Sequence, residues 1–441
     1  MEVLGLRQQQ ATSPIQTRNT AHRSTLKLRT LNADTIMFGK NELTPEQKLT
    51  RKRRIYEHAV KNGYAIPAYN INNMEQAKGV FKAAKDAKSP LIVQASEGAV
   101  KYAGVNYLVA MANVAKEEAG TDTPIMIHLD HGHTFEACKK FIDAGGDSVM
   151  IDGSKLPFEE NVALTKQVVD YAHKNGVFVE AELGKLAGVE DTHDGGKKSL
   201  FTDPKEAKEF VKRTGCDSLA ISIGTSHGHV KFGPDEKPEL DFERLTEIKK
   251  AIAELADEPG VTEEQKEHYK NYPFVLHGAS SSPKDLIDKS NQYLCVPRPL
   301  WDKMVDVSTG KALPDTITGE DVKDMEKHSK KVKGKGVPEE MYTQAASLGI
   351  AKVNVDSDFR ASVFGSIKEF MSNNPTKTDP RGYFGAARDS ITAIAVRKMG
   401  VLKSQGQAEA ANKAANGESD DNKSKNTDSK KDVWGQFNVK A

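Results

Sequence analysis

The chain has few cysteines, no long apolar run and almost no net charge. Its three cysteines, Cys138, Cys216 and Cys295, lie far apart and form no CxxC pair. This pattern favours structural thiols in a reducing compartment over disulfides or a cysteine-rich metal site. No uninterrupted apolar stretch approaches the length of about 18 residues that a transmembrane helix needs. The 63 basic and 62 acidic residues leave a net charge of +1, which argues against nucleic acid or a membrane as the main partner.

Both ends of the 441-residue chain differ in composition from its middle. Residues 1–45 are rich in Arg, Ser, Thr and Gln and poor in acids. This composition is typical of an organelle transit peptide, or of a disordered leader that carries no targeting signal. Residues 404–441 are polar and have few large apolar side chains, so we expect a disordered tail. The expected location is cytoplasmic, or a plastid or mitochondrion if the leader is a transit peptide.

Residues 46–403 contain eight short β-like runs that alternate with helical patterns. The runs are AIPAYN (65–70), PLIVQAS (90–96), PIMIHLDH (124–131), DSVMIDG (147–153), VFVEAELG (177–184), SLAISIG (218–224), PFVLHGAS (273–280) and AKVNVDS (351–357). Several are continuously apolar, as expected for parallel strands covered on both sides. The sequence therefore predicts an α/β fold, a (β/α)8 TIM barrel with disordered N- and C-terminal extensions.

The segments between these runs carry helix signals. Apolar residues recur at helical spacing at Ala77, Val80, Phe81 and Ala84, and again at Leu245, Ile248, Ile252 and Leu255. Asp203, Pro204 and Glu206 predict the start of another helix. The longer gaps at 256–272 and 291–337 are expected to be surface insertions.

Polar side chains stand at the same end of all eight predicted strands. They are Asn70, Ser96, Asp130 with His131, Asp152, Glu182, His227, His277, and Asn354 with Asp356. A lone histidine on an apolar strand is usually a hydrogen-bonded core residue. Eight strands with the same feature are difficult to explain by packing, and active sites of this fold lie at the carboxyl ends of the strands.

Three of these histidines suit a metal site. His131 lies in HLDHG, His227 in GTSHG and His277 in LHGAS. Three imidazoles from separate strands can form an open zinc site with positions left for water or substrate. Asp130 adds a proton-transfer group beside the metal. We expect His133, His193 and His229 not to be ligands.

Small and polar residues after the seventh and eighth strands suggest phosphate binding. Gly278, Ala279 and Ser280 follow one strand, and residues 354–357 end the other. The loops at these places are the usual phosphate cradle of the fold. Gly228 would let the backbone approach a ligand closely, although a single glycine more often marks a turn. The loop 183–196 could close over a ligand and bring Glu190 as a base, or could be a mobile solvent loop.

Five segments taken together resemble a known family. HLDHGHTFEACKKFIDAGGDSVMIDGS, VEAELGKLAGVED, IGTSHG, VLHGAS and KVNVDSD resemble the zinc-dependent, class II fructose-bisphosphate aldolases, and in particular their type B branch. The resemblance covers roughly residues 50–400 and implies a (β/α)8 barrel. It also implies reversible cleavage of fructose 1,6-bisphosphate to dihydroxyacetone phosphate and glyceraldehyde 3-phosphate in glycolysis and gluconeogenesis.

The resemblance implies a role for each matching residue. The catalytic zinc ion would be held by His131, His227 and His277, with Asp152 and Glu182 marking a second position that the metal can visit. Asp130 would exchange the proton of the C4 hydroxyl, and Glu190 would move the C3 proton. Substrate contacts would come from Ser96, Gly228, Gly278, Ala279, Ser280, Asn354, Val355, Asp356, Ser357, Arg360 and Asp379. A monovalent cation (Na+ or K+) near the phosphate and a homodimer or homotetramer are common in the family.

Three other functions stay open on the sequence alone. A tagatose-1,6-bisphosphate aldolase differs only at the C4 configuration, where contacts near Asp130 and Asp379 would decide. A barrel metallohydrolase could use His131 and His133, but it would not need the phosphate loops. A catalytically silent scaffold is disfavoured, because no member of the proposed site is missing.

Overall fold

The protein is described here by a computed structural model. The described residues are 43–120, 122–184, 201–225, 238–278, 281, 283–292 and 336–418, together with two short strand pairs at 189–190 with 193–194 and 305–306 with 311–312. All positions named below belong to this part of the chain unless stated otherwise.

Eight parallel strands close into a barrel, which confirms the predicted (β/α)8 TIM barrel. The strands are β1 (Ile66–Asn70), β2 (Leu91–Ser96), β3 (Ile125–Gly132), β4 (Ser148–Ile151), β5 (Phe178–Leu183), β8 (Ser218–Ile221), β9 (Phe274–Leu276) and β12 (Ile350–Val355). Their order around the barrel is β1-β12-β9-β8-β5-β4-β3-β2. Each strand falls within or one residue beyond the range expected from its apolar run. The parallel register brings the carboxyl ends together, as in the pairing of Ser96 with Asp130.

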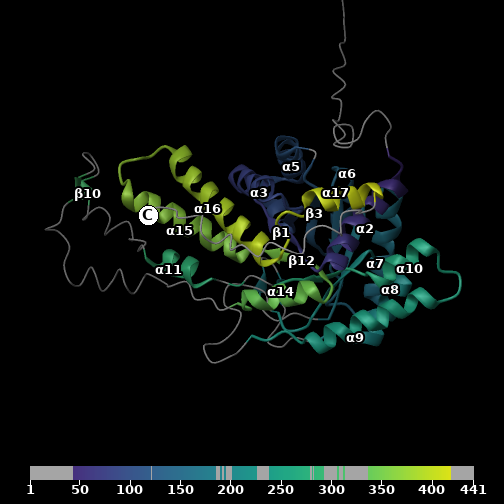
Figure 1. The fold of residues 1–441 in the computed structure, drawn as a ribbon. Coiled ribbons are helices and arrows are strands. Elements are labelled where there is room, and N and C mark those ends of the chain that lie inside the picture. Colours follow the sequence, from purple (N-terminus) through teal and green to yellow (C-terminus); the bar gives the residue numbers. More distant parts are fainter. Residues whose placement is uncertain are drawn as a thin grey trace, which may run out of the picture.

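Helices surround the barrel and connect its strands (Figure 1). They are α2 (Pro45–Asn62), α3 (Met74–Ala87), α4 (Glu97–Ala103), α5 (Val105–Ala119), α6 (Phe135–Asp143), α7 (Phe158–Lys174), α8 (Pro204–Thr214), α9 (Phe242–Ala253), α10 (Glu263–Lys270), α11 (Lys284–Gln292), α14 (Glu339–Ser347), α15 (Ser357–Asn373), α16 (Pro380–Val401) and α17 (Ala408–Asn416). None of them has the length and apolar character that a membrane span requires.

The helix signals in the sequence are confirmed. The apolar stripe of residues 77–84 is buried on α3, and Leu245, Ile248 and Ile252 are buried on α9. At the start of α8, the Asp203 carboxylate accepts hydrogen bonds from two backbone N–H groups. Since Pro204 lacks an N–H group, it fits the first turn, where that group would have no partner inside the helix.

The barrel interior changes character from bottom to top. Successive side chains of a strand point to opposite sides, so residues two apart share the interior. At the amino-terminal end, Tyr56 of α2 stacks on Phe178 with ring centroids 4.4 Å apart and closes the barrel with apolar side chains. Further along the same strands, the interior positions carry charged and polar groups. The site is therefore reached from the carboxyl-terminal rim.

The carboxyl-terminal region differs from the expected disordered tail. Ser404 is fully buried, and α17 packs on α2 through Ala408, Ala411 and Ala415. The expectation therefore fails for residues 404–418. The boundary at residue 404 was set by the scarcity of large apolar side chains. Alanines at helical spacing can bury surface although they are small, so this criterion missed the helix. Residues 1–42 and 419–441 lie outside the described residues.

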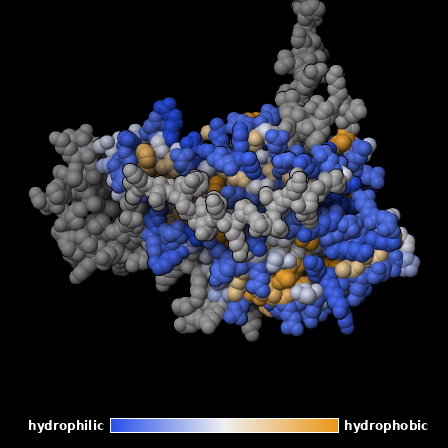
Figure 2. Space-filling model, in the orientation of Figure 1, coloured by the Kyte–Doolittle hydropathy of each residue, from blue (hydrophilic) through white to orange (hydrophobic). Residues whose placement is uncertain are grey.

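The first of the two predicted insertions is folded. Residues 256–272 include α10, whose N-terminus is closed by Thr262 and Gln265 in a reciprocal capping box. His268 of α10 contacts Glu57 of α2 through Nδ1 and Oε1 at 3.0 Å. Most of the second insertion, 291–337, lies outside the described residues. The face of the molecule in view is mostly hydrophilic, with a hydrophobic patch beside α14 (Figure 2).

Candidate active site

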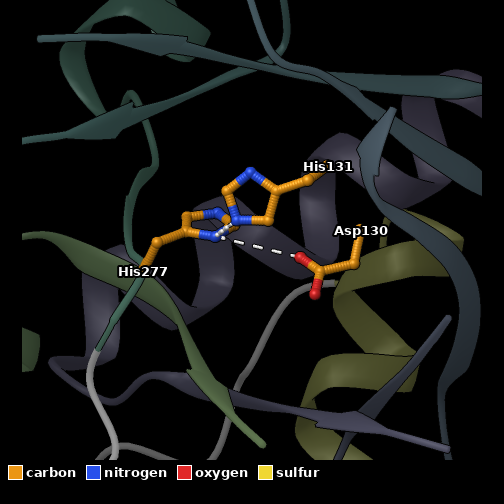
Figure 3. A group of neighbouring side chains, drawn as sticks. All are labelled: Asp130, His131 and His277. Carbon is orange, nitrogen blue, oxygen red and sulfur yellow. Dashed lines mark hydrogen bonds and ion pairs between the residues drawn. The ribbon is translucent and has the colours of Figure 1, made fainter. Parts of the chain in front are cut away.

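The carboxyl ends of five strands bring polar side chains to one buried cluster. The described members are Asp130 and His131 of β3, Asp152 after β4, Glu182 of β5, His277 after β9, and Asn354 of β12. Each is less than a tenth exposed. The carboxylate of Asp130 and the rings of His131 and His277 face one another (Figure 3). The structure thus gathers residues that the sequence placed at separate strand ends.

The backbone at His131 is shaped to aim its ring. His131 has a φ of 51°, in the left-handed region that non-glycine residues rarely adopt. The pairing of β3 with β4 also shifts register between Leu129 and Gly132. A Cβ atom at Gly132 would lie 2.8 Å from Leu129 and 2.9 Å from Cys138, so only glycine fits there. Such irregularities redirect side chains near active sites, and the strain at His131 therefore points to function.

Asp130 is held through both carboxylate oxygens. Oδ2 accepts a hydrogen bond from Asn70 Nδ2 at 2.8 Å, and Oδ1 accepts one from Asn354 Nδ2 at 2.9 Å. Gln94 in turn donates to Asn70 Oδ1 at 2.6 Å, which fixes the orientation of that amide. The carboxylate is therefore positioned before any substrate arrives.

Each of the two imidazoles has a carboxylate behind it. His131 Nδ1 lies 3.0 Å from Asp152 Oδ2, and His277 Nε2 lies 2.6 Å from Glu180 Oε1. A carboxylate accepts, so each contact places a proton on the outer nitrogen of the imidazole ring. The inner nitrogens, His131 Nε2 and His277 Nδ1, face each other at 2.9 Å, and Asn354 Nδ2 donates to the same His277 Nδ1 at 2.9 Å.

This donor set fits a metal ion. Two nitrogens that each lie about 2.0–2.1 Å from one tetrahedral zinc ion are about 3.3 Å apart, close to the separation seen here. A carboxylate behind a metal-binding histidine is the usual arrangement that orients the ring. Two overlapping groups could hold an ion, Asp130 with His131 and His277, and His131 with Asp152 and Glu182. A cation held by these groups would offset the negative charge of the surrounding carboxylates.

The electrostatics of the cluster are dominated by buried acids. Burial disfavours the charged ring of His131, but the hydrogen bond to Asp152 and the charges of Asp130 and Glu182 outweigh it and raise its pKa well above the usual range. Burial would raise the pKa of Asp152, yet the bond to His131 and the contacts with Ser154 lower it. The site therefore attracts positive charge, whether a proton or a metal ion.

The loops after β9 and β12 lie next to this cluster. Gly278 has a φ of 60°, which suits glycine, and the backbone N–H of Ser281 donates to Asp358 Oδ2 at 3.3 Å. Asn354 and Val355 end β12, and Ser357 begins α15. Asp356, which is buried, forms an ion pair with Arg360 at 2.6 Å. The predicted phosphate side of the site is thus built from adjoining segments.

Two other predicted substrate contacts have structural partners. The Ser96 hydroxyl accepts a hydrogen bond from the backbone N–H of Ala99 and caps α4 at the rim. Asp379 caps α16, and its half-exposed carboxylate is paired with Arg381. These contacts explain both residues locally, and their roles toward a substrate stay predictions.

Several predicted residues lie outside the described part of the chain. They are His227, Gly228, Ala279 and Ser280. The backbone of Glu190 is described and pairs with His193 between β6 (Val189–Glu190) and β7 (His193–Asp194), but its side chain is not.

Sequence reasoning missed a set of polar residues deeper in the barrel. Gln94, His128 and Glu180 are buried beneath the rim residues. Each precedes a predicted site residue, Ser96, Asp130 or Glu182, by two positions. Because residues two apart on a strand point to the same side, this spacing was the signal that could have revealed them.

Known proteins share this fold and these segments. The chain matches the family described as "Fructose-bisphosphate aldolase class-II" over residues 50–296 and 321–407. It is 41% identical to the fructose-bisphosphate aldolase of Treponema pallidum over 376 residues, which cover 82% of this chain and 98% of that protein. It is 40% identical to the fructose-bisphosphate aldolase of Giardia intestinalis, with 81% and 93% of the two chains covered. A crystal structure of a putative fructose-1,6-biphosphate aldolase from Coccidioides immitis aligns with a TM-score of 0.59 and 26% identity, covering 82% of this chain and 99% of that one.

The family match makes this closed barrel an aldolase of the metal-dependent class, and its facing imidazoles and buried carboxylate could hold the metal ion. The chain belongs to the class II fructose-bisphosphate aldolase family.

Proposed function

We propose that this aldolase uses zinc to cleave fructose 1,6-bisphosphate reversibly to dihydroxyacetone phosphate and glyceraldehyde 3-phosphate, a reaction of glycolysis and gluconeogenesis. The observation that carries the proposal is the pair of inner nitrogens of His131 and His277, which are 2.9 Å apart beside Asp130. The relatives named as fructose-bisphosphate aldolases support the choice of substrate.

The proposed metal ligands are His131 and His277 together with His227. Two imidazoles backed by carboxylates suit zinc, which prefers nitrogen and sulfur donors and tetrahedral geometry. Asp152 and Glu182 are proposed for a second position of the metal, because their oxygens lie 3.0 and 3.7 Å from His131 Nδ1. When bound, the ion supplies Lewis-acid stabilisation of the negative charge that develops on the substrate oxygens.

Asp130 is proposed to exchange the proton of the C4 hydroxyl. Its oxygen Oδ1 lies 3.8 Å from His277 Nδ1, so a substrate held beside the histidines would be within reach. The two amide hydrogen bonds from Asn70 and Asn354 hold the carboxylate in place while the proton moves. Glu190, on the loop after β5, is proposed to move the C3 proton.

Asn354 and the loops after β9 and β12 are proposed to hold the dihydroxyacetone phosphate half. The buried side-chain oxygen of Asn354 accepts no hydrogen bond from the described residues, so it can receive one from a substrate hydroxyl. The proposed phosphate contacts are Gly228, residues 278–280 and residues 355–357, with a monovalent cation nearby. Ser96, Arg360 and Asp379 are proposed for the glyceraldehyde 3-phosphate half.

The contacts of Lys352 argue against a Schiff-base aldolase. Lys352 lies inside β12, two residues before Asn354 of the site, and it is fully buried. It contacts both oxygens of Glu180 and the ring of His128. An ammonium group in this enclosure cannot attack a carbonyl without losing these partners.

A homodimer or homotetramer is also proposed. The exposed surface carries large apolar side chains, including Tyr102 at 79%, Tyr107 at 74% and Met371 at 52% exposure. Such side chains are suited to contacts between subunits. Light scattering coupled to size exclusion would show a mass that is a multiple of 48.3 kDa, whereas a single chain mass would contradict the proposal.

The decisive experiment is a cleavage assay after removal of the metal. The purified protein should release triose phosphates from fructose 1,6-bisphosphate, lose this activity with a chelator and regain it with added zinc. Tagatose 1,6-bisphosphate, assayed in parallel, should be cleaved more slowly. Activity that survives complete chelation, or a lysine adduct trapped with borohydride, would overturn the mechanism. Release of inorganic phosphate without triose phosphates would favour a metallohydrolase.

A further inference from the structure

A second layer of buried polar side chains, including an ion pair, lies beneath the proposed metal ligands. Glu180 of β5, Lys352 of β12 and His128 of β3 are each fully buried inside the barrel. They come from strands far apart in the sequence, and each stands two residues before a side chain of the upper cluster. We call these three residues the lower layer. Charged groups are buried in this way only when they are paired and hydrogen-bonded.

The contacts of Lys352 satisfy its amino group completely. Nζ lies 2.9 Å from Glu180 Oε2, 3.1 Å from Glu180 Oε1 and 3.2 Å from His128 Nε2. An ammonium group has three N–H bonds and no lone pair, so these acceptors match it. His128 must then accept at Nε2 and donate from Nδ1, which lies 2.9 Å from the Ser148 hydroxyl. The lower layer therefore has one consistent arrangement of protons.

Glu180 connects the lower layer to the proposed metal site. Both oxygens of Glu180 contact Lys352, and one of them, Oε1, also lies 2.6 Å from His277 Nε2. A proton on that nitrogen leaves the lone pair of His277 on Nδ1, which faces His131 Nε2 and the amide of Asn354, both at 2.9 Å. Glu182, two residues along β5, instead faces His131, with Oε2 3.7 Å from its Nδ1. The two carboxylates of β5 thus face two different histidines.

We propose that Glu180, held by the Lys352 ammonium, is a positioning residue for His277. It fixes the rotation of the imidazole and keeps the proton on Nε2, so that the lone pair on Nδ1 points toward His131 and Asn354, where the metal ion would bind. This inference rests on the proposed function, since it needs His277 to be a metal ligand. It gives Lys352 a role as the counter-charge of Glu180.

The test separates the hydrogen bond to His277 from the buried charges. Glu180→Gln/Lys352→Met and Glu180→Leu/Lys352→Met both remove the buried ion pair and keep similar volumes. Only the first retains an acceptor for His277 Nε2. Single substitutions of Glu180 are less informative, because they leave the Lys352 ammonium buried without its carboxylate.

Zinc affinity is measured by competition with a chromophoric chelator, and cobalt is substituted to record its visible absorption spectrum. We call the double variants Leu/Met (Glu180→Leu with Lys352→Met) and Gln/Met (Glu180→Gln with Lys352→Met). We expect the Leu/Met variant to bind zinc about 10–100-fold more weakly than the Gln/Met variant and to have a different cobalt spectrum. Neither readout depends on turnover. Equal zinc affinity and identical cobalt spectra in the two variants would overturn the inference and leave Glu180 a structural residue.

Asp217→Asn is the control for a general loss of stability. Asp217 is also a fully buried carboxylate, but it pairs with Arg53 at the amino-terminal end of the barrel. This variant should unfold at a lower temperature and keep the zinc affinity of the unmodified protein. If the unmodified protein binds no zinc, the proposed function fails. If the unmodified protein binds zinc, but the two double variants have the same zinc affinity and the same cobalt spectrum, the role of Glu180 fails while the proposed function stands.

Discussion

Replacement of Asp130 is the sharpest perturbation of the proposed chemistry. The side chain is 2% exposed and accepts one amide hydrogen bond on each oxygen. Asp130→Ala removes the group that would exchange the proton but leaves His131 and His277 in place. We therefore expect a protein that retains zinc and loses most of its cleavage activity.

The structure sets the size of both effects. Positioned general acid–base groups contribute about 10²–10⁴-fold to rates, so kcat should fall by at least about 100-fold in Asp130→Ala. The Asn70 amide loses its acceptor, whereas the Asn354 amide loses one acceptor and keeps His277 Nδ1 at 2.9 Å. An orphaned buried donor costs about 1–3 kcal/mol, so the variant should also be less stable by about that amount.

Asp130→Asn makes a different prediction from the same contacts. The oxygen of the new amide can accept from either Asn70 or Asn354. Its NH2 group then faces the NH2 group of the other residue, so that two donors oppose each other. We expect a loss of kcat similar to that of Asp130→Ala without a cavity. The KM for fructose 1,6-bisphosphate should change far less than kcat, because the phosphate contacts are untouched.

Steady-state cleavage rates, zinc content per chain and thermal unfolding test these expectations together. Asp86→Ala is the matched control, since Asp86 is a half-exposed carboxylate on α3 that pairs with Lys82. It should keep full activity and zinc content. Near-normal turnover in either Asp130 variant with zinc still bound would refute the role of Asp130. Loss of zinc along with activity would instead make Asp130 a metal ligand.

Two further predictions concern the fold. Burial would raise the pKa of Asp217, but the charge of Arg53 and hydrogen bonding lower it, so its contribution to stability is present above about pH 4 and is lost as pH falls. Asp217→Asn should therefore lower the free energy of unfolding by about 3 kcal/mol at pH 7. Urea titrations should show this difference becoming smaller below about pH 4. A difference that does not change with pH would contradict the role of the ion pair. A Cβ atom at Gly79 would lie 2.9 Å from Ile391 Cγ2, so Gly79→Ala should lower the unfolding temperature through overpacking of about 1–3 kcal/mol. Gly385→Ala is the control, because a Cβ atom there would meet no other atom within 4 Å. It should raise the unfolding temperature through a gain in helix propensity of about 1 kcal/mol. Equal effects of the two substitutions would exclude the steric explanation.

The sequence predicted the barrel because its strands are nearly continuous apolar runs with polar ends. The outer faces of β3 and β5 contribute residues such as Leu129 and Ala181 to the core between barrel and helices. The ends of the same strands carry Asp130 and Glu182 to the rim. Strand length, apolar content and the polar ends were therefore sufficient to predict the architecture and to place these candidate site residues at one end of the barrel.

The lower layer could not be placed from apolar content alone. His128, Glu180 and Lys352 lie inside runs that were assigned as strands for their apolar residues, and the three are at least 52 positions apart from one another in the chain. Only the closed barrel brings them into contact. The helix α17 was missed for a related reason, since alanines bury surface only once α2 supplies the opposite face.

The vertical order inside the barrel explains why the site attracts a cation. The apolar plug that contains Tyr56 and Phe178 closes the bottom. Above it, the charge of Glu180 is offset by Lys352 at 2.9 Å. The upper cluster has no such lysine among the described residues, although it gathers Asp130, Asp152 and Glu182 around the histidines. Its acids therefore require a positive charge from elsewhere, and a divalent ion beside His131 and His277 would supply it at the place where the substrate develops negative charge.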